Sequence, residues 1–189
     1  MASTNTTVDV TSTKAPAAPG TEDIILEVND LKKYFPIKGG MFNRTQGYVK
    51  AVDGVSFKLR RGHTMGLVGE SGCGKSTTGR TILRLAGEKT GGDVLFNGRE
   101  VYSLSHKEMH DLRTKMQIIF QDPYSSLSPR LPISEIVGEA VREHNLVPKD
   151  QFDDYIEKVM EECGLQPYHK MRYPHEFSGG QRQRICIAR

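Results

Sequence analysis

The sequence predicts an α/β fold organised around one phosphate-binding loop, with an antiparallel β-subdomain before the loop and a small α-helical subdomain after it. Three observations support this prediction. Residues 69–76 fit the pattern G-x-x-x-x-G-K-[S/T]. A short apolar run of strand type precedes the loop, and a run of helical type follows it. Two later segments carry apolar residues at helical spacing, which indicates the helical subdomain.

The loop itself is predicted to bind a nucleotide triphosphate with Mg²⁺. Its glycines allow backbone angles closed to other residues and let main-chain N–H groups approach phosphate oxygens, while the following helix directs its N-terminus at the same anion. Lys75 is expected to reach the β- and γ-phosphates, and the Ser76 hydroxyl is expected to ligate Mg²⁺. The alternative is a glycine-rich turn with a chance Lys-Ser, which the flanking strand and helix argue against. The candidate ligand residues are Gly69, Glu70, Ser71, Gly72, Cys73, Gly74, Lys75, Ser76 and Thr77.

The residues on either side of the loop predict a strand before it and a helix after it. Residues 64–68 (TMGLV) are an apolar run bounded by glycines, which predicts a buried parallel strand. Residues 75–85 predict a helix whose Ile82, Leu83 and Leu85 face the sheet.

Composition narrows the function classes. The net charge of +3 is small and no basic block stands out, so charge gives no reason to invoke nucleic acid. Three cysteines without framework or metal spacing fit a reducing compartment. Cys73 is either a thiol activated near a helix N-terminus or simply a small loop residue. No apolar run approaches the roughly 20 residues that span a bilayer, so a membrane role would be peripheral.

The segment before the loop is read as a tail followed by strands. Residues 1–23 are predicted to be a disordered tail, and they lack the pattern of a signal peptide, so the cytoplasm is expected. Residues 24–35 predict strand, turn and strand around Asn29-Asp30, and residues 48–59 predict another pair around Asp53-Gly54. Residues 36–47 between them predict an irregular loop.

The segment after the first helix predicts a hairpin and then helices. Residues 91–101 carry a hairpin signal at Asn97-Gly98, and Ser105 with Glu108 predicts a capped helix to about Lys115. Residues 117–120 predict a buried strand that runs into a loop at residues 121–130. Apolar residues at helical spacing in residues 133–141 and 152–163 predict two amphipathic helices whose stripes form core. A Ser-Gly-Gly sequence at residues 178–180 predicts a second helix N-terminus suited to an anion.

Residues 177–181 (FSGGQ) resemble the L-S-G-G-Q signature of ATP-binding-cassette (ABC) ATPases, with Phe in the Leu position. Gln121 corresponds to the Gln of the family's Q-loop, and Tyr34 is the first choice for the aromatic that stacks on adenine, with Phe35 or Tyr48 as alternatives. The runs FQDPYSSLSPR and YPHEFSGGQRQR resemble the F-type ATPase of oligopeptide and dipeptide importers. The resemblance covers residues 24–189, with His63 as one departure where such proteins often carry Glu.

The resemblance implies a P-loop NTPase core of the ABC ATPase type, with residues 24–120 as β-subdomain and loop core and residues 121–189 as Q-loop, helical subdomain and signature helix. In this family two cassettes pair head to tail, so the partner's ATP would be bound by Ser178, Gly179, Gly180 and Gln181. Gln121 would sense the γ-phosphate and Mg²⁺. The implied partners are a second ATPase subunit, more in keeping with a heterodimer, transmembrane permease subunits and, indirectly, a solute-binding protein. The implied location is the inner face of the cell membrane.

The family's Walker B Asp, catalytic Glu and switch His have no counterparts in the sequence. The family places that strand just after the dipeptide matched by Ala188-Arg189, so the sequence is interpreted as a partial ABC ATPase domain. Residues 118–122 imitate Walker B, but their Gln-Asp-Pro context favours the Q-loop. We therefore expect weak ATP binding and negligible turnover from these residues alone. The alternatives are import of another small solute such as nickel, a non-transport ABC ATPase, and a non-catalytic regulatory fragment.

Overall fold

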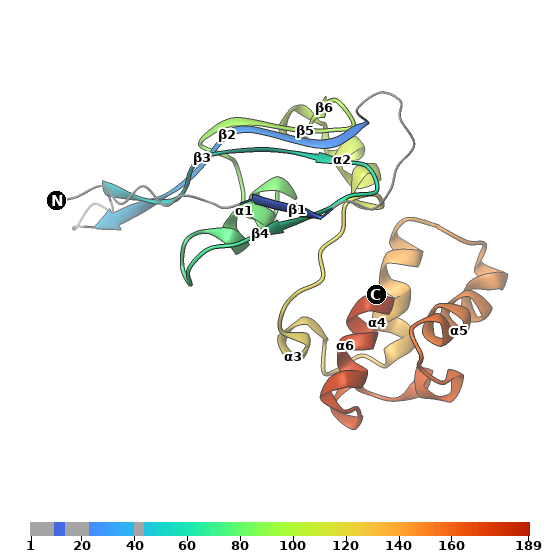
Figure 1. Ribbon diagram of the computed structural model, residues 1–189. Coiled ribbons are helices and arrows are strands. Elements are labelled where there is room, and N and C mark those ends of the chain that lie inside the picture. The colour runs from blue at the N-terminus through green and yellow to red at the C-terminus, as the bar shows by residue number, and fades with distance from the viewer. Residues whose placement is uncertain (1–9, 14–22, 40–43) are drawn as a thin grey trace. The chain divides into compact units, whose positions relative to one another are not determined.

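The computed structural model describes residues 10–13, 23–39 and 44–189. The chain divides into two compact units, Met1–His110 and Asp111–Arg189, which are coloured blue to green and yellow to red in Figure 1. Each unit has its own core and is described by itself. No helix in the described ranges is long and apolar enough to cross a membrane.

The first unit contains the predicted antiparallel sheet. Its strand order is β3-β2-β5-β6, and the strands are β2 (Ile24–Gly39), β3 (Arg44–Arg60), β5 (Gly91–Phe96) and β6 (Arg99–Glu100). Helix α1 (Lys75–Ile82) lies under one face of this sheet (Figure 1) and buries Thr78, Thr81 and Ile82. The short helix η1 (Val101–Ser103) and helix α2 (His106–Arg113) follow. The apolar core comprises Val28, Leu31, Val52, Ile82, Val94, Phe96, Val101, Leu104 and Met109.

The two turns predicted at Asn29-Asp30 and Asp53-Gly54 are wrong, because β2 and β3 run continuously through them. A type I′ hairpin needs positive φ at both central residues. Asn97 and Gly98 meet that requirement, with φ of 47° and 74°, and the predicted hairpin there is confirmed. In each of the other two dipeptides only one residue has a positive φ: Asp30 (48°) and Gly54 (79°). The β2–β3 register also shifts between Val28 and Leu31, as expected for a β-bulge.

The predicted loop at residues 36–47 is also largely strand. β2 continues to Gly39 and β3 begins at Arg44, which extends the two strands into a long ribbon. Residues 40–43 of that prediction lie outside the described residues. The capping box predicted before α2 is confirmed, because the Ser105 N–H donates to Glu108 Oε2 at 3.0 Å and the Glu108 N–H donates to Ser105 Oγ at 3.3 Å.

The strand before the phosphate loop forms, but not as a buried parallel strand. β4 (Thr64–Leu67) pairs antiparallel with β1 (Val10–Thr13), and all strand pairs among the described residues are antiparallel. A strand becomes parallel and buried only beside neighbours that run in its direction, and Val68 after β4 is 59 % exposed. Residues 10–13 therefore also depart from the predicted disorder, whereas the rest of that prediction, at residues 1–9 and 14–22, lies outside the described residues.

Helix α1 ends three residues earlier than predicted. Arg84 has a φ of 55°, which no α-helix continues, and Leu85 is 46 % exposed instead of facing the sheet. Ile82 is buried as expected.

The second unit is helical, as predicted. Its main helices are α4 (Ile133–Glu143), α5 (Phe152–Glu162) and α6 (Gly179–Ala188). The shorter helices are α3 (Pro123–Ser126), η2 (Lys149–Gln151), η3 (Pro167–Met171) and η4 (Pro174–Glu176). The core comprises Leu127, Ile133, Ile136, Val137, Val141, Ile156, Met160, Leu165, Phe177 and Ile185, so the predicted stripes of both amphipathic helices are core. Helices α4 and α5 pack closely, because a Cβ on Gly138 would lie 2.3 Å from Phe152 Cζ.

The strand predicted at residues 117–120 does not form. Ile119 is 62 % exposed and Phe120 is 42 % exposed, and the segment has no assigned secondary structure. A lone apolar run becomes a strand only when a neighbour accepts its backbone hydrogen bonds. No strand pairs with it among the described residues.

Candidate nucleotide site

The phosphate loop joins β4 to α1, and two of its glycines have backbone angles that favour glycine. Gly72 has a φ of 84° and Gly74 a φ of 98°. A Cβ on Gly74 would lie 2.2 Å from the Ala51 carbonyl oxygen of β3, so a side chain is excluded by β3 as well as by conformation. The loop therefore lies directly against β3.

The end of the loop combines open N–H groups with a positive charge. Gly74 is the N-cap of α1 and provides no side-chain cap, and the first turn of the helix has no acidic residue. The first N–H groups of a helix lack intrahelical partners, and its dipole favours an anion there. Lys75 Nζ bends back over the loop, donating to the carbonyl oxygens of Gly69 at 2.8 Å and Glu70 at 2.7 Å. These groups together fit a phosphate.

The first unit offers few side-chain ligands for a divalent cation. Ser76 is exposed in the first turn of α1, where its hydroxyl can serve as a hard oxygen ligand. No cluster of three or more His, Cys, Asp or Glu side chains that could hold a metal occurs among the described residues. Mg²⁺ fits here in the way typical of nucleotide enzymes, bound mainly through phosphate oxygens with a protein hydroxyl.

The Cys73 thiol lies inside the loop, 3.5 Å from Lys75 Nζ. A Cβ on Gly69 would lie 2.7 Å from Cys73 Sγ, so the thiol also occupies the space beside that glycine. These contacts agree with the simpler alternative, a small residue that fills the loop.

The three aromatic candidates for the adenine platform lie on two faces of the β2–β3 ribbon. The face toward the loop is identified by Lys33 and Val52, which pair in register and are both buried. Val52 Cγ2 lies 3.9 Å from a Cβ built on Gly74. Because successive residues of a strand alternate in direction, Phe35 shares the face of Lys33, and Tyr34 faces the opposite side.

Contacts of Tyr34 agree with this assignment. The Tyr34 hydroxyl donates to the Asp53 carboxylate, and Lys50 Nζ lies 5.2 Å from the Tyr34 ring centroid. That hydrogen bond raises the pKa of Tyr34 and lowers the pKa of Asp53. Tyr48 lies two residues from Lys50, on the same side as Tyr34. The geometry thus favours Phe35, an alternative in the sequence, over Tyr34 and Tyr48.

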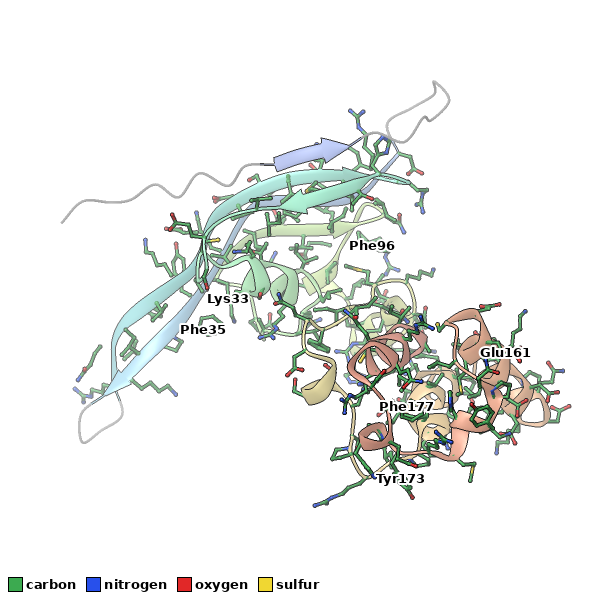
Figure 2. All side chains as sticks on the ribbon, turned by 60° about the horizontal axis from the view of Figure 1, so that its bottom comes forward. Lys33, Phe35, Phe96, Glu161, Tyr173 and Phe177 are labelled. Carbon is green, nitrogen blue, oxygen red and sulfur yellow. The ribbon has the colours of Figure 1, made fainter. Side chains whose placement is uncertain are left out.

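Figure 2 shows Lys33 and Phe35 on the side of the sheet where α1 lies. Lys33 Nζ lies 4.9 Å from the Phe35 ring centroid, and the ring is 41 % exposed. Sequence reasoning missed Lys33 altogether. The signal that could have found it is the alternation of Leu31, Lys33 and Phe35, which places a lysine in an otherwise apolar series.

The signature residues gather at the N-terminus of α6, as predicted. Ser178 is the N-cap, its Oγ accepts the Gln181 N–H at 3.3 Å, and Gln181 Oε1 accepts the Ser178 N–H at 3.0 Å. Phe177 before them is buried at 4 % exposure, which fixes this end of the helix in the core. Gly179 and Gly180 are exposed, and nothing lies within 4 Å of a Cβ built on either.

Gln121 lies in the second unit, together with the signature helix. It follows the exposed residues 117–120 and precedes α3, and its side chain is exposed. The role predicted for it stays a prediction.

Comparison with known proteins places the chain in one family. Residues 52–189 match the family model of the ABC transporter. The oligopeptide transport ATP-binding protein AppF of Bacillus subtilis is 50% identical over 169 residues, which cover 89% of this chain and 51% of that protein. The glutathione import ATP-binding protein GsiA of Pectobacterium atrosepticum is 45% identical over 185 residues, which cover 98% of this chain and 30% of that protein. The chain thus spans about half or less of the length of these relatives.

Solved structures agree on the fold. CbiO1 of Clostridium perfringens, described as part of the ABC transporter complex cbiONQ, has a TM-score of 0.63 at 25% identity, over 88% of this chain and 61% of that one. The dimeric bacterial ABC transporter cassette MJ0796 has a TM-score of 0.67 at 22% identity, over 86% of this chain and 67% of that one. With the family match over residues 52–189, these findings show that the chain belongs to the ABC transporter family.

Proposed function

We propose that this protein is the ATP-binding subunit of an ABC importer that takes up oligopeptides or dipeptides. The observation that carries the proposal is the glycine loop at the uncapped end of α1, with Lys75 folded over it. The solute class rests on similarity to the B. subtilis oligopeptide transport protein. ATP with Mg²⁺ is the ligand that such a loop and an adjacent aromatic ring would accept.

Each part of the site has a proposed task. Phe35 supplies a flat apolar surface for the adenine ring. The N–H groups at the start of α1 and the Lys75 ammonium hold the phosphates, and the Ser76 hydroxyl ligates the cation. Gln121 responds to the γ-phosphate.

The signature end of α6 completes a nucleotide site on a second cassette. Ser178 and the N–H groups of Gly179 and Gly180 contact the phosphate held by that cassette, so each site needs two chains. Binding of ATP then favours the paired state over the separated one, which is the differential affinity that a transport cycle requires.

The proposed partners are a second ATPase subunit, permease subunits and, through them, a solute-binding protein. The proposed location is the inner face of the membrane, as a peripheral subunit. The choice of solute belongs to the permease and the binding protein rather than to this chain.

The test is affinity purification of the protein from a detergent extract of its native membranes. Co-purification of hydrophobic permease subunits with a second ATPase is the expected result. A matched Lys75→Ala variant should still recover the permease while losing ATP binding, which separates assembly from nucleotide binding. Recovery of nucleic acid or ribosomes without any membrane subunit would contradict the importer proposal.

A further inference from the structure

The first unit buries a lysine that the proposed nucleotide contacts do not use. Lys33 is 7 % exposed, although lysines are seldom buried without a partner. Its neighbour Lys32 points the other way, with 35 % of its side chain exposed and an ion pair to Asp30 at 2.7 Å. The two adjacent lysines therefore have different surroundings, and only Lys33 faces the phosphate-loop side.

The Lys33 ammonium contacts the segment between α1 and β5 as well as the Phe35 ring. Its Nζ donates to the Glu88 carbonyl oxygen at 2.6 Å, in the segment between α1 and β5. It also lies 3.8 Å from a Cβ built on Gly87, whose φ is 74°. One hydrogen bond thus fixes the ammonium against the segment that follows the nucleotide-binding helix.

The same ammonium lies over the Phe35 ring, 4.9 Å from its centroid. A cation over the face of an aromatic ring is attracted by the ring quadrupole, and the attraction grows when the cation is removed from water. The ring is still 41 % exposed, so part of it remains open to a ligand. Phe35 lies in the part of β2 beyond Lys32, the last β2 residue paired with β5, so β5 does not hold this part of the strand.

We propose that Lys33 is a positioning residue that holds the Phe35 ring in the orientation in which it accepts adenine. This inference rests on the proposed function. The ammonium fixes the ring from one side, so the ring does not have to be ordered when the base arrives. Removing the charge leaves the phosphate contacts intact but lowers the affinity for the base.

The experiment compares two ligands, ATP and inorganic tripolyphosphate, by titration calorimetry on the purified protein. Tripolyphosphate reports on the loop alone, whereas ATP also reports on the base platform. Lys33→Met should weaken ATP binding about fivefold, the size expected for a partly desolvated cation–π contact, and leave tripolyphosphate binding unchanged. Lys32→Met is the matched control on the opposite face and should change neither.

Further variants show whether Lys33 acts through the ring. In a Phe35→Ala background, Lys33→Met should have no additional effect on ATP binding. Lys33→Arg keeps the cation and should restore ATP affinity. Lys33→Gln retains a donor for the Glu88 carbonyl without the charge, so it should behave like Lys33→Met and serves if the methionine variant fails to fold.

Three results would overturn the inference: equal losses of ATP and tripolyphosphate binding, an undiminished effect of Lys33→Met without the Phe35 ring, or unchanged ATP affinity in both Lys33→Met and Lys33→Gln. Failure of the proposed function looks different. In that case Lys75→Ala would bind ATP and tripolyphosphate as the unmodified protein does.

Discussion

Helices α1 and α6 both begin at glycines suited to an anion, yet their N-termini are built differently. Helix α1 begins after Gly74, which is held in a left-handed conformation against β3 and supplies no side-chain cap. Helix α6 begins after Ser178, whose hydroxyl and backbone N–H are both engaged by Gln181. The first end has no side-chain cap, whereas at the second the Ser178 hydroxyl already accepts the Gln181 N–H.

The difference bears on when each end can bind phosphate. The open N–H groups of α1, beside the Lys75 ammonium, can bind phosphate without breaking a side-chain cap. The Ser178 cap is worth about 1 kcal/mol, so a phosphate that took over the Gln181 N–H would have to displace an existing hydrogen bond. An end that holds nucleotide and an end that engages it only transiently would differ in this way.

The largest expected effect comes from placing a side chain in the open end. Gly74→Ala would bring Cβ to 2.2 Å from the Ala51 oxygen at a φ of 98°, so the loop must move. Losing two phosphate hydrogen bonds at about 2 kcal/mol each lowers ATP affinity by roughly 700-fold, measurable by titration calorimetry.

Gly79→Ala is the control for that change, because nothing lies within 4 Å of its added Cβ inside α1. Alanine there should leave ATP affinity intact and stabilise the helix by about 0.5–1 kcal/mol. Equal ATP affinity in the two variants would show that the left-handed glycine is not essential to the open end.

A smaller effect should follow from removing the cap of α6. Ser178→Ala leaves the Gln181 N–H without its side-chain acceptor and should lower the free energy of unfolding of the second unit by about 1 kcal/mol. Ser178→Asn keeps an acceptor and should lose only a few tenths of a kcal/mol. Urea unfolding followed by circular dichroism measures both, and indistinguishable stabilities of the Ala and Asn variants would remove the contrast between the two helix ends.

The smallest expected effect is a pH dependence of the stability of the second unit, which arises from His169. Burial lowers the pKa of His169, and its Nδ1 must stay unprotonated to accept the Gln166 N–H at 3.1 Å. The unfolded chain protonates this ring near pH 6.5, and the folded chain does so only at lower pH. The contribution of neutral His169 to the free energy of unfolding is therefore complete above about pH 6.5 and is lost as the pH falls through the folded pKa.

Urea unfolding at a series of pH values between 7.5 and 5 measures this loss. His169→Asn retains a side-chain acceptor but cannot be protonated in this range, so its stability should depend less on pH. The same pH dependence in the variant would assign the loss to other groups.

Local patterns predicted most of the helical unit and the loop. Apolar spacing identified α4 and α5, and the Ser-Gly-Gly-Gln run identified the start of α6, because each signal lies within one element. The glycine loop was equally readable, since its chemistry depends on consecutive residues.

The sheet was harder to predict, because strand pairing depends on distant neighbours. Asp30 and Gly54 carry turn chemistry, yet each forms a bulge because its partner strand continues past it. The choice of Phe35 over Tyr34 needed the register of β2 against β3, which fixes the face of every residue at once. The burial of Lys33 could not be predicted from its residue type, because lysine is ordinarily a surface residue.

The claim that the open end of α1 binds the triphosphate of ATP is tested most directly by Lys75→Ala. Titration calorimetry should show that the unmodified protein binds both ATP and inorganic tripolyphosphate, and that the variant loses at least about 30-fold in affinity for each, as expected for charge-assisted hydrogen bonds. Thermal unfolding without ligand should be little changed, since among the described residues the ammonium donates to two loop carbonyls and the Cys73 sulfur. A folded Lys75→Ala protein that binds both ligands with unchanged affinity would contradict the account.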